Sequence, residues 1–60
     1  MSKLKEYRIA HSIAQIELAK ILGISKQSYS RKEISNYFTV EEANAICKFL
    51  KCSYEDIFFE

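Results

Sequence analysis

Apolar residues recur at helical spacing along this 60-residue chain, and short polar breaks separate the runs. The chain has no proline and a single glycine, which favours helices over a turn-rich β fold. We therefore expect an all-α fold, a compact bundle of five short helices within one domain at 1–60. The longest run ends near Leu50, and its apolar stripe consists of Val40, Ala43, Ile46, Cys47 and Leu50.

The stretch 15–33 predicts two short helices that meet at a tight turn. Gly23 follows the first apolar run and can end a helix, because glycine adopts the left-handed conformation without steric cost. Ser25 is placed to cap the second helix, which begins at the next residue. Ala19 is small enough to sit where the helices cross, and Tyr29 falls on the face that packs back. This spacing is typical of a helix-turn-helix.

Other helix starts are predicted from Ser or Thr residues that are followed three positions later by Gln, Glu or Asp, as in a capping box. The pairs are Ser12 with Gln15, Thr39 with Glu42, and Ser53 with Asp56. A further helix is expected at 2–10, with Ser2 as its cap and Leu4 and Tyr7 facing the core. The last short helix is expected to end in Ile57, Phe58 and Phe59, of which we expect Phe59 to be exposed.

The second helix of the pair carries a polar face without acids. On a helical wheel, Lys26, Gln27, Ser30 and Arg31 share one side, and Tyr29 lies opposite. Arg and Lys suit guanine edges, Gln suits adenine, and Ser suits base or phosphate. Any solvated helix face can carry such residues, so the face alone leaves DNA binding and plain solvent exposure both open.

Charge is divided unevenly although the net charge is only +1. Residues 1–38 carry a net charge of +4, and residues 39–60 carry −3. This polarity is expected of a domain that meets phosphates with one side. No apolar run approaches the length of a membrane helix, and the N-terminus lacks the apolar stretch of a signal peptide. We therefore expect a cytoplasmic protein.

Residues for catalysis or metal binding are sparse. His11 is the only histidine and falls in a loop, where we assign it no role. Cys47 and Cys52 lie five positions apart without a CxxC motif, so we interpret them as reduced, partly buried apolar residues. The sequence also lacks a glycine-rich phosphate loop and a nucleophile with a spaced base. We expect no enzyme activity, no metal, no cofactor and no small-molecule ligand.

Several motifs in a fixed order resemble the Cro and lambda-repressor type of helix-turn-helix protein, the XRE family. They are Leu4-Lys5-Glu6-Tyr7-Arg8, Gln15-Ile16-Glu17-Leu18-Ala19-Lys20, Leu22-Gly23-Ile24-Ser25, Ser30-Arg31-Lys32-Glu33 and Phe49-Leu50-Lys51-Cys52-Ser53. The resemblance implies a lambda-repressor-like fold and sequence-specific binding of double-stranded DNA by a transcriptional regulator. The small size suggests a Cro-like repressor, of phage or bacterial origin. Since one such domain contacts few base pairs, we expect a homodimer on a palindromic operator, with the region around Phe58 and Phe59 as a candidate contact.

The resemblance also implies roles for single residues. Arg8 would form a structural ion pair with Glu33, and helix 26–33 would enter the major groove with its amino end first. Base contacts are expected from Lys26, Gln27, Ser28 and Arg31, and backbone contacts from Gln15, Ser30, Asn36 and Tyr37. The chain departs from the family at Ala14, where Ser or Thr is usual, and at Lys32, where an apolar residue is usual. We expect the stem of Lys32 to lie along the core and its ammonium to reach water.

The connector that we expect at 34–38 lacks the glycine and basic residues that the family often has there. We expect Phe38 to pack in the core, whereas Tyr37 fits a core position and a phosphate contact equally well. The absence of Lys and Arg from this segment, together with the modest net charge, keeps a second function open. That alternative is a protein-interaction module, such as an antitoxin-type partner domain.

Overall fold

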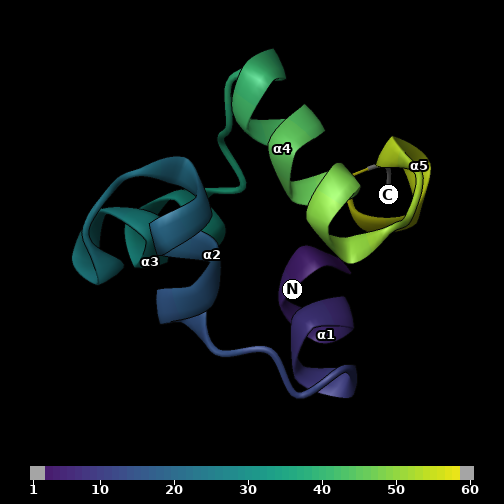
Figure 1. Ribbon diagram of the computed structural model, residues 1–60, viewed down its shortest axis with the longest axis horizontal. Helices are drawn as coiled ribbons and strands as arrows, with labels where there is room; N and C mark the ends of the chain where they lie inside the picture. The colour runs from purple at the N-terminus through teal and green to yellow at the C-terminus, as the bar shows by residue number, and fades with distance from the viewer. Residues whose placement is uncertain (1–2, 59–60) are drawn as a thin grey trace.

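The computed structural model describes residues 3–58, and within that range all regular structure is helical. The elements are α1 (Lys3–Ala10), α2 (Gln15–Leu22), α3 (Lys26–Ser35), α4 (Val40–Leu50) and α5 (Tyr54–Ile57), drawn in Figure 1. The prediction of an all-α bundle of five short helices is confirmed. None of these helices combines the length and apolar character needed to cross a bilayer.

The helices form two groups that α4 joins. Helix α2 packs against α3 and α4, while α1 packs against α5, which also contacts α4. In Figure 1 the α2–α3 pair lies on one side, α1 and α5 lie on the other, and α4 spans the space between them. The radius of gyration is 10.1 Å, which matches the value of about 10 Å expected for a folded chain of this length.

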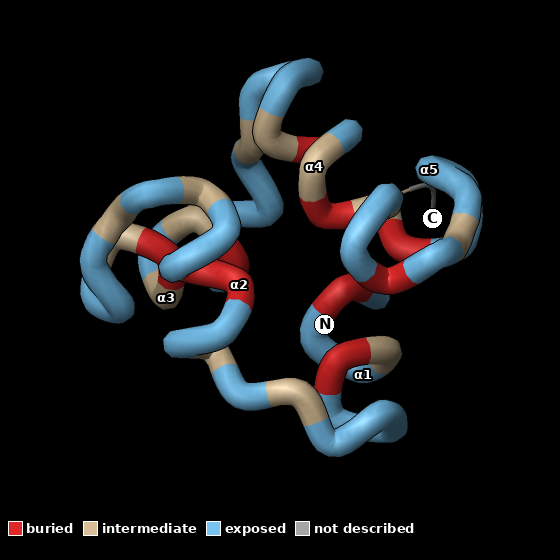
Figure 2. Tube along the Cα trace, in the orientation of Figure 1, coloured by how far each residue is buried: buried red, intermediate tan, exposed pale blue. Residues whose placement is uncertain are grey.

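The core is small and draws on every helix. Figure 2 shows the buried positions on the turns of each helix that face the centre of the molecule. Tyr7, as predicted, and Phe38 are partly buried and pack against this cluster. The ring of Phe38 lies against Phe58, with centroids 5.5 Å apart in an edge-on arrangement. The buried cluster consists of Leu4, Leu18, Ala19, Tyr29, Ile46, Leu50 and Ile57.

The start of α2 differs from the predicted capping box of Ser12 and Gln15. Ala14 is the N-cap residue, and its backbone N–H donates to the Glu17 carboxylate at 2.9 Å. Ser12 instead adopts a left-handed conformation, with φ at 57°, and its N–H bonds to the carbonyl of Ile9. The predicted cap failed because Ser12 belongs to the turn that ends α1, whereas the predicted helix start at Gln15 is confirmed.

The end of α3 also differs from the prediction, because the helix runs two residues beyond Glu33, to Ser35. The hydroxyl of Ser35 donates to the carbonyl of Arg31 at 2.9 Å and so keeps the last turn closed. Asn36 then ends the helix with φ at 56°, in the left-handed region that asparagine tolerates. Gly23 ends α2 in the same region, as predicted, with φ at 71°. Ile34 and Ser35 therefore belong to α3 and not to the connector.

The second half of the chain follows the predictions at its caps but not at every apolar position. Thr39 and Glu42 form the predicted capping box, with bonds of 3.0 and 3.1 Å in the two directions. The backbone N–H of Ser53 donates to the Asp56 carboxylate at 3.0 Å, at the predicted start of α5. Val40 was wrongly assigned to the buried stripe, because it is 76% exposed at the first position of α4. Ser2 and Phe59 lie outside the described residues.

A buried carboxylate joins three helices. The Glu33 side chain accepts two hydrogen bonds from Arg8, at 3.0 and 3.2 Å, which confirms the ion pair that the resemblance implied. It also accepts the hydroxyl of Tyr29 at 2.7 Å and the amide of Gln15 at 3.0 Å. The Nη1 group of Arg8 donates to the Ile13 carbonyl at 2.8 Å. Within residues 3–58, no buried side-chain polar atom is left without a partner.

The ionised form of Glu33 is the one that this network favours. Burial by itself would raise the pKa of Glu33, but the hydrogen bonds from Arg8, Tyr29 and Gln15, with the Arg8 charge, lower it below its usual value of 4.5. Burial and the neighbouring carboxylate raise the pKa of Tyr29, so its hydroxyl stays a donor. The network is therefore complete at neutral pH.

We predict that Tyr29→Phe destabilises the protein by roughly 1.5–3 kcal/mol, the range for a hydrogen bond to a charged group. The ring stays in the core, and only the donor to Glu33 is lost. Tyr37→Phe is the matched control, because Tyr37 is 70% exposed and makes no such bond within residues 3–58. The measurement is the free energy of unfolding in urea at pH 7. Equal effects of the two substitutions would contradict the role given to the network.

We also predict that stability falls as the pH drops below about 4.5. Because the pKa of Glu33 is lower in the folded state, the unfolded chain binds this proton more readily, and acid favours unfolding. Glu42, whose pKa is also lowered, chiefly by the Thr39 backbone N–H, adds to the same fall. In Tyr29→Phe the pKa of Glu33 is lowered less, because one hydrogen bond is missing. The free energies of unfolding of the variant and the wild-type protein should therefore converge towards pH 3. Parallel curves would show that Glu33 does not carry the effect.

Candidate nucleic-acid interface

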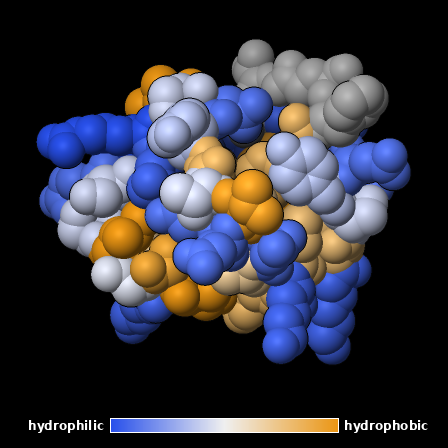
Figure 3. Space-filling view, turned by 90° about the horizontal axis from the view of Figure 1, so that it is seen from above, coloured by the Kyte–Doolittle hydropathy of each residue, from blue (hydrophilic) through white to orange (hydrophobic). Residues whose placement is uncertain are grey.

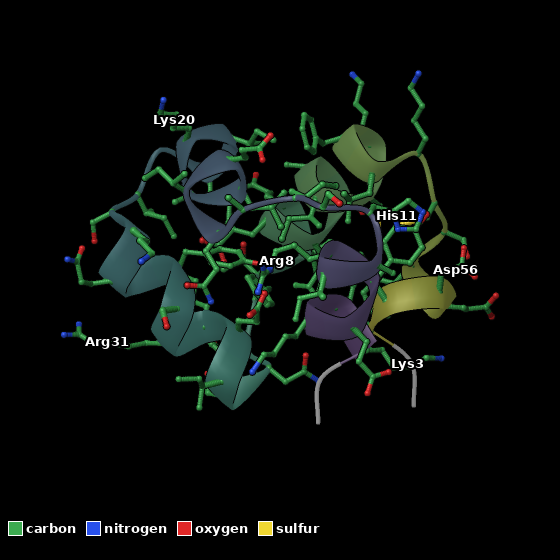
Figure 4. All side chains as sticks on the ribbon, turned by 90° about the horizontal axis from the view of Figure 1, so that it is seen from below. Lys3, Arg8, His11, Lys20, Arg31 and Asp56 are labelled. Atoms are coloured by element: carbon green, nitrogen blue, oxygen red, sulfur yellow. The ribbon has the colours of Figure 1, made fainter. Side chains whose placement is uncertain are left out.

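The outward face of α3 presents three polar side chains to solvent. Lys26, Gln27 and Arg31 are all exposed. Within residues 3–58, none of the three makes a hydrogen bond or an ion pair. Figure 4 shows Arg31 pointing away from the body of the molecule, whereas Arg8 lies between α1 and α3. The face predicted from the helical wheel is therefore available to a ligand.

The opposite face of α3 fixes how the helix is presented. Tyr29 and Glu33 are buried, at 0% and 2% exposure, and both belong to the network with Arg8. At the amino end, the Ser25 hydroxyl accepts the backbone N–H of Ser28 at 3.1 Å, as the predicted cap requires. The cap at the amino end and the buried side chains therefore fix the helix backbone and the direction in which the outward side chains leave it.

Ser28 and Ser30 lie at the margin of the exposed face, and both are half-buried. The Ser28 hydroxyl accepts the Ser25 hydroxyl at 3.1 Å, so this predicted base contact is part of the helix cap. Asn36 and Tyr37, the other two predicted backbone contacts of this region, are exposed where α3 ends. The exposure of Tyr37 resolves the open choice in favour of a surface position and against core packing.

Gln15 comes from the amino end of α2 and meets α3 through Glu33. Its amide nitrogen donates to the Glu33 carboxylate at 3.0 Å, and the residue is half-buried. A side-chain amide nitrogen carries two N–H groups, and this bond uses one of them. The first backbone N–H groups of α2 have no acceptors within the helix, and the side chain of Ala14 cannot cap them. Gln15 is thus tied to the orientation of α3.

Lys32 has a partner that the sequence analysis did not predict. The residue is half-buried, and its ammonium forms an ion pair with Glu42 on α4 at 3.2 Å. The pairing arises because Lys32 faces α4, where the Thr39 capping box holds the Glu42 carboxylate in place. This cation therefore contributes to helix packing and not to the exposed face of α3.

The charges that remain exposed on α3 are basic. Its one acid, Glu33, is buried against Arg8, and Lys26 and Arg31 are exposed. Exposed acids lie on the other four helices and are Glu6, Glu17, Glu41, Glu55 and Asp56. The exposed face of α3 therefore carries positive charge without an exposed acid of its own.

One exposed apolar side chain on α3 was missed by the sequence analysis. Ile34 is 83% exposed, and it was assigned to the connector because α3 was expected to end at Glu33. The signal that could have found it is its spacing of seven residues from Gln27, which is two helical turns. Ile34 therefore belongs to the same face as Gln27 and Arg31.

The remaining chemically active side chains are used in packing. His11 stacks on Tyr7 with ring centroids 4.1 Å apart. Cys47 and Cys52 are free thiols that pack against the core, as interpreted from the sequence, and burial raises the pKa of both. Residues 3–58 contain no cluster of three or more His, Cys, Asp or Glu side chains that could hold a metal ion.

Comparisons with known proteins show the family of this chain. The chain is 41% identical over 58 residues to the uncharacterized HTH-type transcriptional regulator MJ0272 of Methanocaldococcus jannaschii, covering 95% of this chain and 88% of that protein. It is 38% identical over 55 residues to the antitoxin PezA of Streptococcus pneumoniae, covering 90% of this chain but only 35% of PezA. The family described as the Cro/C1-type HTH DNA-binding domain matches residues 3–58. The chain belongs to the Cro/C1-type HTH DNA-binding domain family.

Proposed function

We propose that this protein is a transcriptional regulator that binds a specific sequence in double-stranded DNA through α3. The observation that carries the proposal is the outward face of that helix. Its side chains of Lys26, Gln27 and Arg31 have no partner within residues 3–58, while the buried Glu33 network fixes the helix behind them. Membership of a DNA-binding domain family supports the same function.

The mechanism that we propose is insertion of α3 into the major groove with its amino end first. Lys26 and Arg31 suit the acceptor pair of guanine, and Gln27 suits the donor and acceptor of adenine. Ser28 would contact a base through its hydroxyl, which can rotate away from the cap. Because the inward face of α3 is bonded to α1 and α2, the backbone of the helix would be ordered before binding, and only its exposed side chains would lose conformational freedom in the groove.

Backbone contacts would clamp the protein on either side of the groove. Gln15 has one amide N–H left after bonding to Glu33, and that group would donate to a phosphate oxygen at the amino end of α2. Ser30, Asn36 and the hydroxyl of Tyr37 would supply neutral hydrogen bonds near the carboxyl end of α3. These contacts position the domain and carry no sequence information directly.

A single domain of this size reads few base pairs, so we propose a homodimer on a palindromic operator. The contact that we expected around Phe58 and Phe59 has little support. Phe58 packs against Phe38 and Tyr54 at the edge of the core, and Phe59 lies outside the described residues. We assign no other dimer surface. We further propose that the protein is a cytoplasmic, Cro-like repressor.

A second candidate function is an antitoxin-type module that binds a protein partner. The similarity to the antitoxin PezA supports it, although the chain spans about a third of that protein. Two large side chains near the end of α3 also support it, because Tyr37 and Val40 are 70% and 76% exposed without a cation beside them in the 36–40 segment. Such side chains suit a protein surface as well as a sugar–phosphate backbone.

We predict that affinity for a selected DNA duplex falls as salt rises. Each phosphate that the protein neutralises releases counterions, which makes the logarithm of affinity linear in the logarithm of salt concentration. Since few cations lie on the α3 face, the slope should correspond to a few phosphates per domain. Fluorescence anisotropy between about 50 and 200 mM salt measures it. A protein without measurable duplex binding at the lower salt would favour the partner-binding function instead.

We predict that Gln27→Ala reduces discrimination at one base pair of each half-site by roughly 1–3 kcal/mol. Asn44→Ala is the matched control, because Asn44 is an exposed amide on α4 and lies outside the proposed interface. Affinities for the selected duplex and for each single-base variant provide the comparison. If Gln27→Ala weakens all duplexes equally, Gln27 does not read a base.

A further inference from the structure

Ile34 is the most exposed large apolar side chain of the described structure, at 83%. It lies in the last two residues of α3, with the polar residues Arg31 and Ser35 as neighbours on that helix. Figure 3 shows that apolar side chains reach the surface among hydrophilic ones, so exposure by itself is unremarkable for this protein. What distinguishes Ile34 is its place on α3.

The position of Ile34 continues the proposed reading face. Seven residues separate it from Gln27, and three separate it from Arg31, so helical geometry aligns the three side chains. Gln27, Arg31 and Ile34 thus stand at the spacing i, i+4 and i+7. When the amino end of α3 enters the major groove, Gln27 would lie deepest, and Ile34, two turns further along the same face, would lie towards the edge of the groove. Ile34 is the member of this set without a hydrogen-bonding group.

An apolar side chain on such a face has one favourable partner in the major groove. Base edges there are hydrogen-bond donors and acceptors, apart from the 5-methyl group of thymine. Isoleucine placed against a donor or acceptor would leave that group without water or a partner, which is unfavourable. Isoleucine placed against the methyl group removes apolar surface of both from water.

We propose that Ile34 determines specificity by packing against the 5-methyl group of a thymine in each half-site. This inference rests on the proposed function of α3 and names one feature of its ligand. Seven residues of helix rise by about 10 Å, and base pairs are stacked about 3.4 Å apart. The thymine therefore lies within about three base pairs of the base pair that Gln27 reads, because α3 enters the groove at an angle to the DNA axis.

The test is a cycle between the protein and the DNA. A duplex selected from a random pool is remade with each thymine in turn replaced by uracil, which removes the methyl group and leaves base pairing intact. Affinities are measured for the wild-type protein and for Ile34→Ala. We expect a single uracil at this thymine, in one half-site at a time, to weaken wild-type binding about fourfold, the equivalent of roughly 0.8 kcal/mol for one buried methyl group. Ile34→Ala should show no dependence at that position.

The matched control is Ile9→Ala, the same change at a residue of α1 that is 58% exposed and outside the proposed interface. It should keep the fourfold dependence on the methyl group. The inference is overturned if no thymine shows the dependence, or if Ile34→Ala retains it. Ile34→Ala weakening every duplex equally would also overturn it, since Ile34 would then contact a second copy of the chain or the backbone. Failure to select any duplex would instead overturn the proposed function.

Discussion

The carboxylate of Glu33 is the point on which the arrangement of the helices depends. It accepts hydrogen bonds from α1 through Arg8, from α2 through Gln15, and from within α3 through Tyr29. A domain of 60 residues buries few apolar side chains, so packing alone leaves the relative rotation of its helices weakly fixed. Directional bonds to one buried charge fix that rotation, although such groups contribute less to net stability.

This network separates the two faces of α3. Tyr29 and Glu33 are held inward, so Gln27 and Arg31, on the other side of the helix, must face solvent. The same carboxylate orients the Gln15 amide at the start of α2. A candidate backbone contact and the candidate base contacts are therefore positioned by one group. In this way a small domain fixes the relative positions of its candidate DNA contacts without a large core.

The surface around α3 combines few exposed cations with exposed apolar side chains. Lys32, a cation that could have faced DNA, is paired with Glu42. The segment after α3 has no Lys or Arg, and it exposes Tyr37 and Val40. Apolar contact and neutral hydrogen bonds thus have a larger share of this surface than charge does. Such a surface depends more on close fit to its partner than on long-range attraction.

The sequence by itself determined the features that depend on local interactions. Helix periodicity, the cap at Ser25, the capping box of Thr39 and the left-handed Gly23 follow from residues a few positions apart, and the structure confirms them. Family resemblance, and not spacing, implied the pair of Arg8 and Glu33, because the two lie 25 positions apart.

Only the tertiary structure decided features in which local signals compete or distant residues meet. Ser12 matched a capping box in the sequence, but it lies in the left-handed turn after α1, and Ala14 is the N-cap residue of α2. Helix α3 continued to Ser35 because Asn36 could take a left-handed conformation, and this placed Ile34 on the outer face. Lys32 forms an ion pair with Glu42 on another helix, and Gln15 donates a hydrogen bond to Glu33. Such pairings depend on how the helices pack, which no short stretch of sequence specifies.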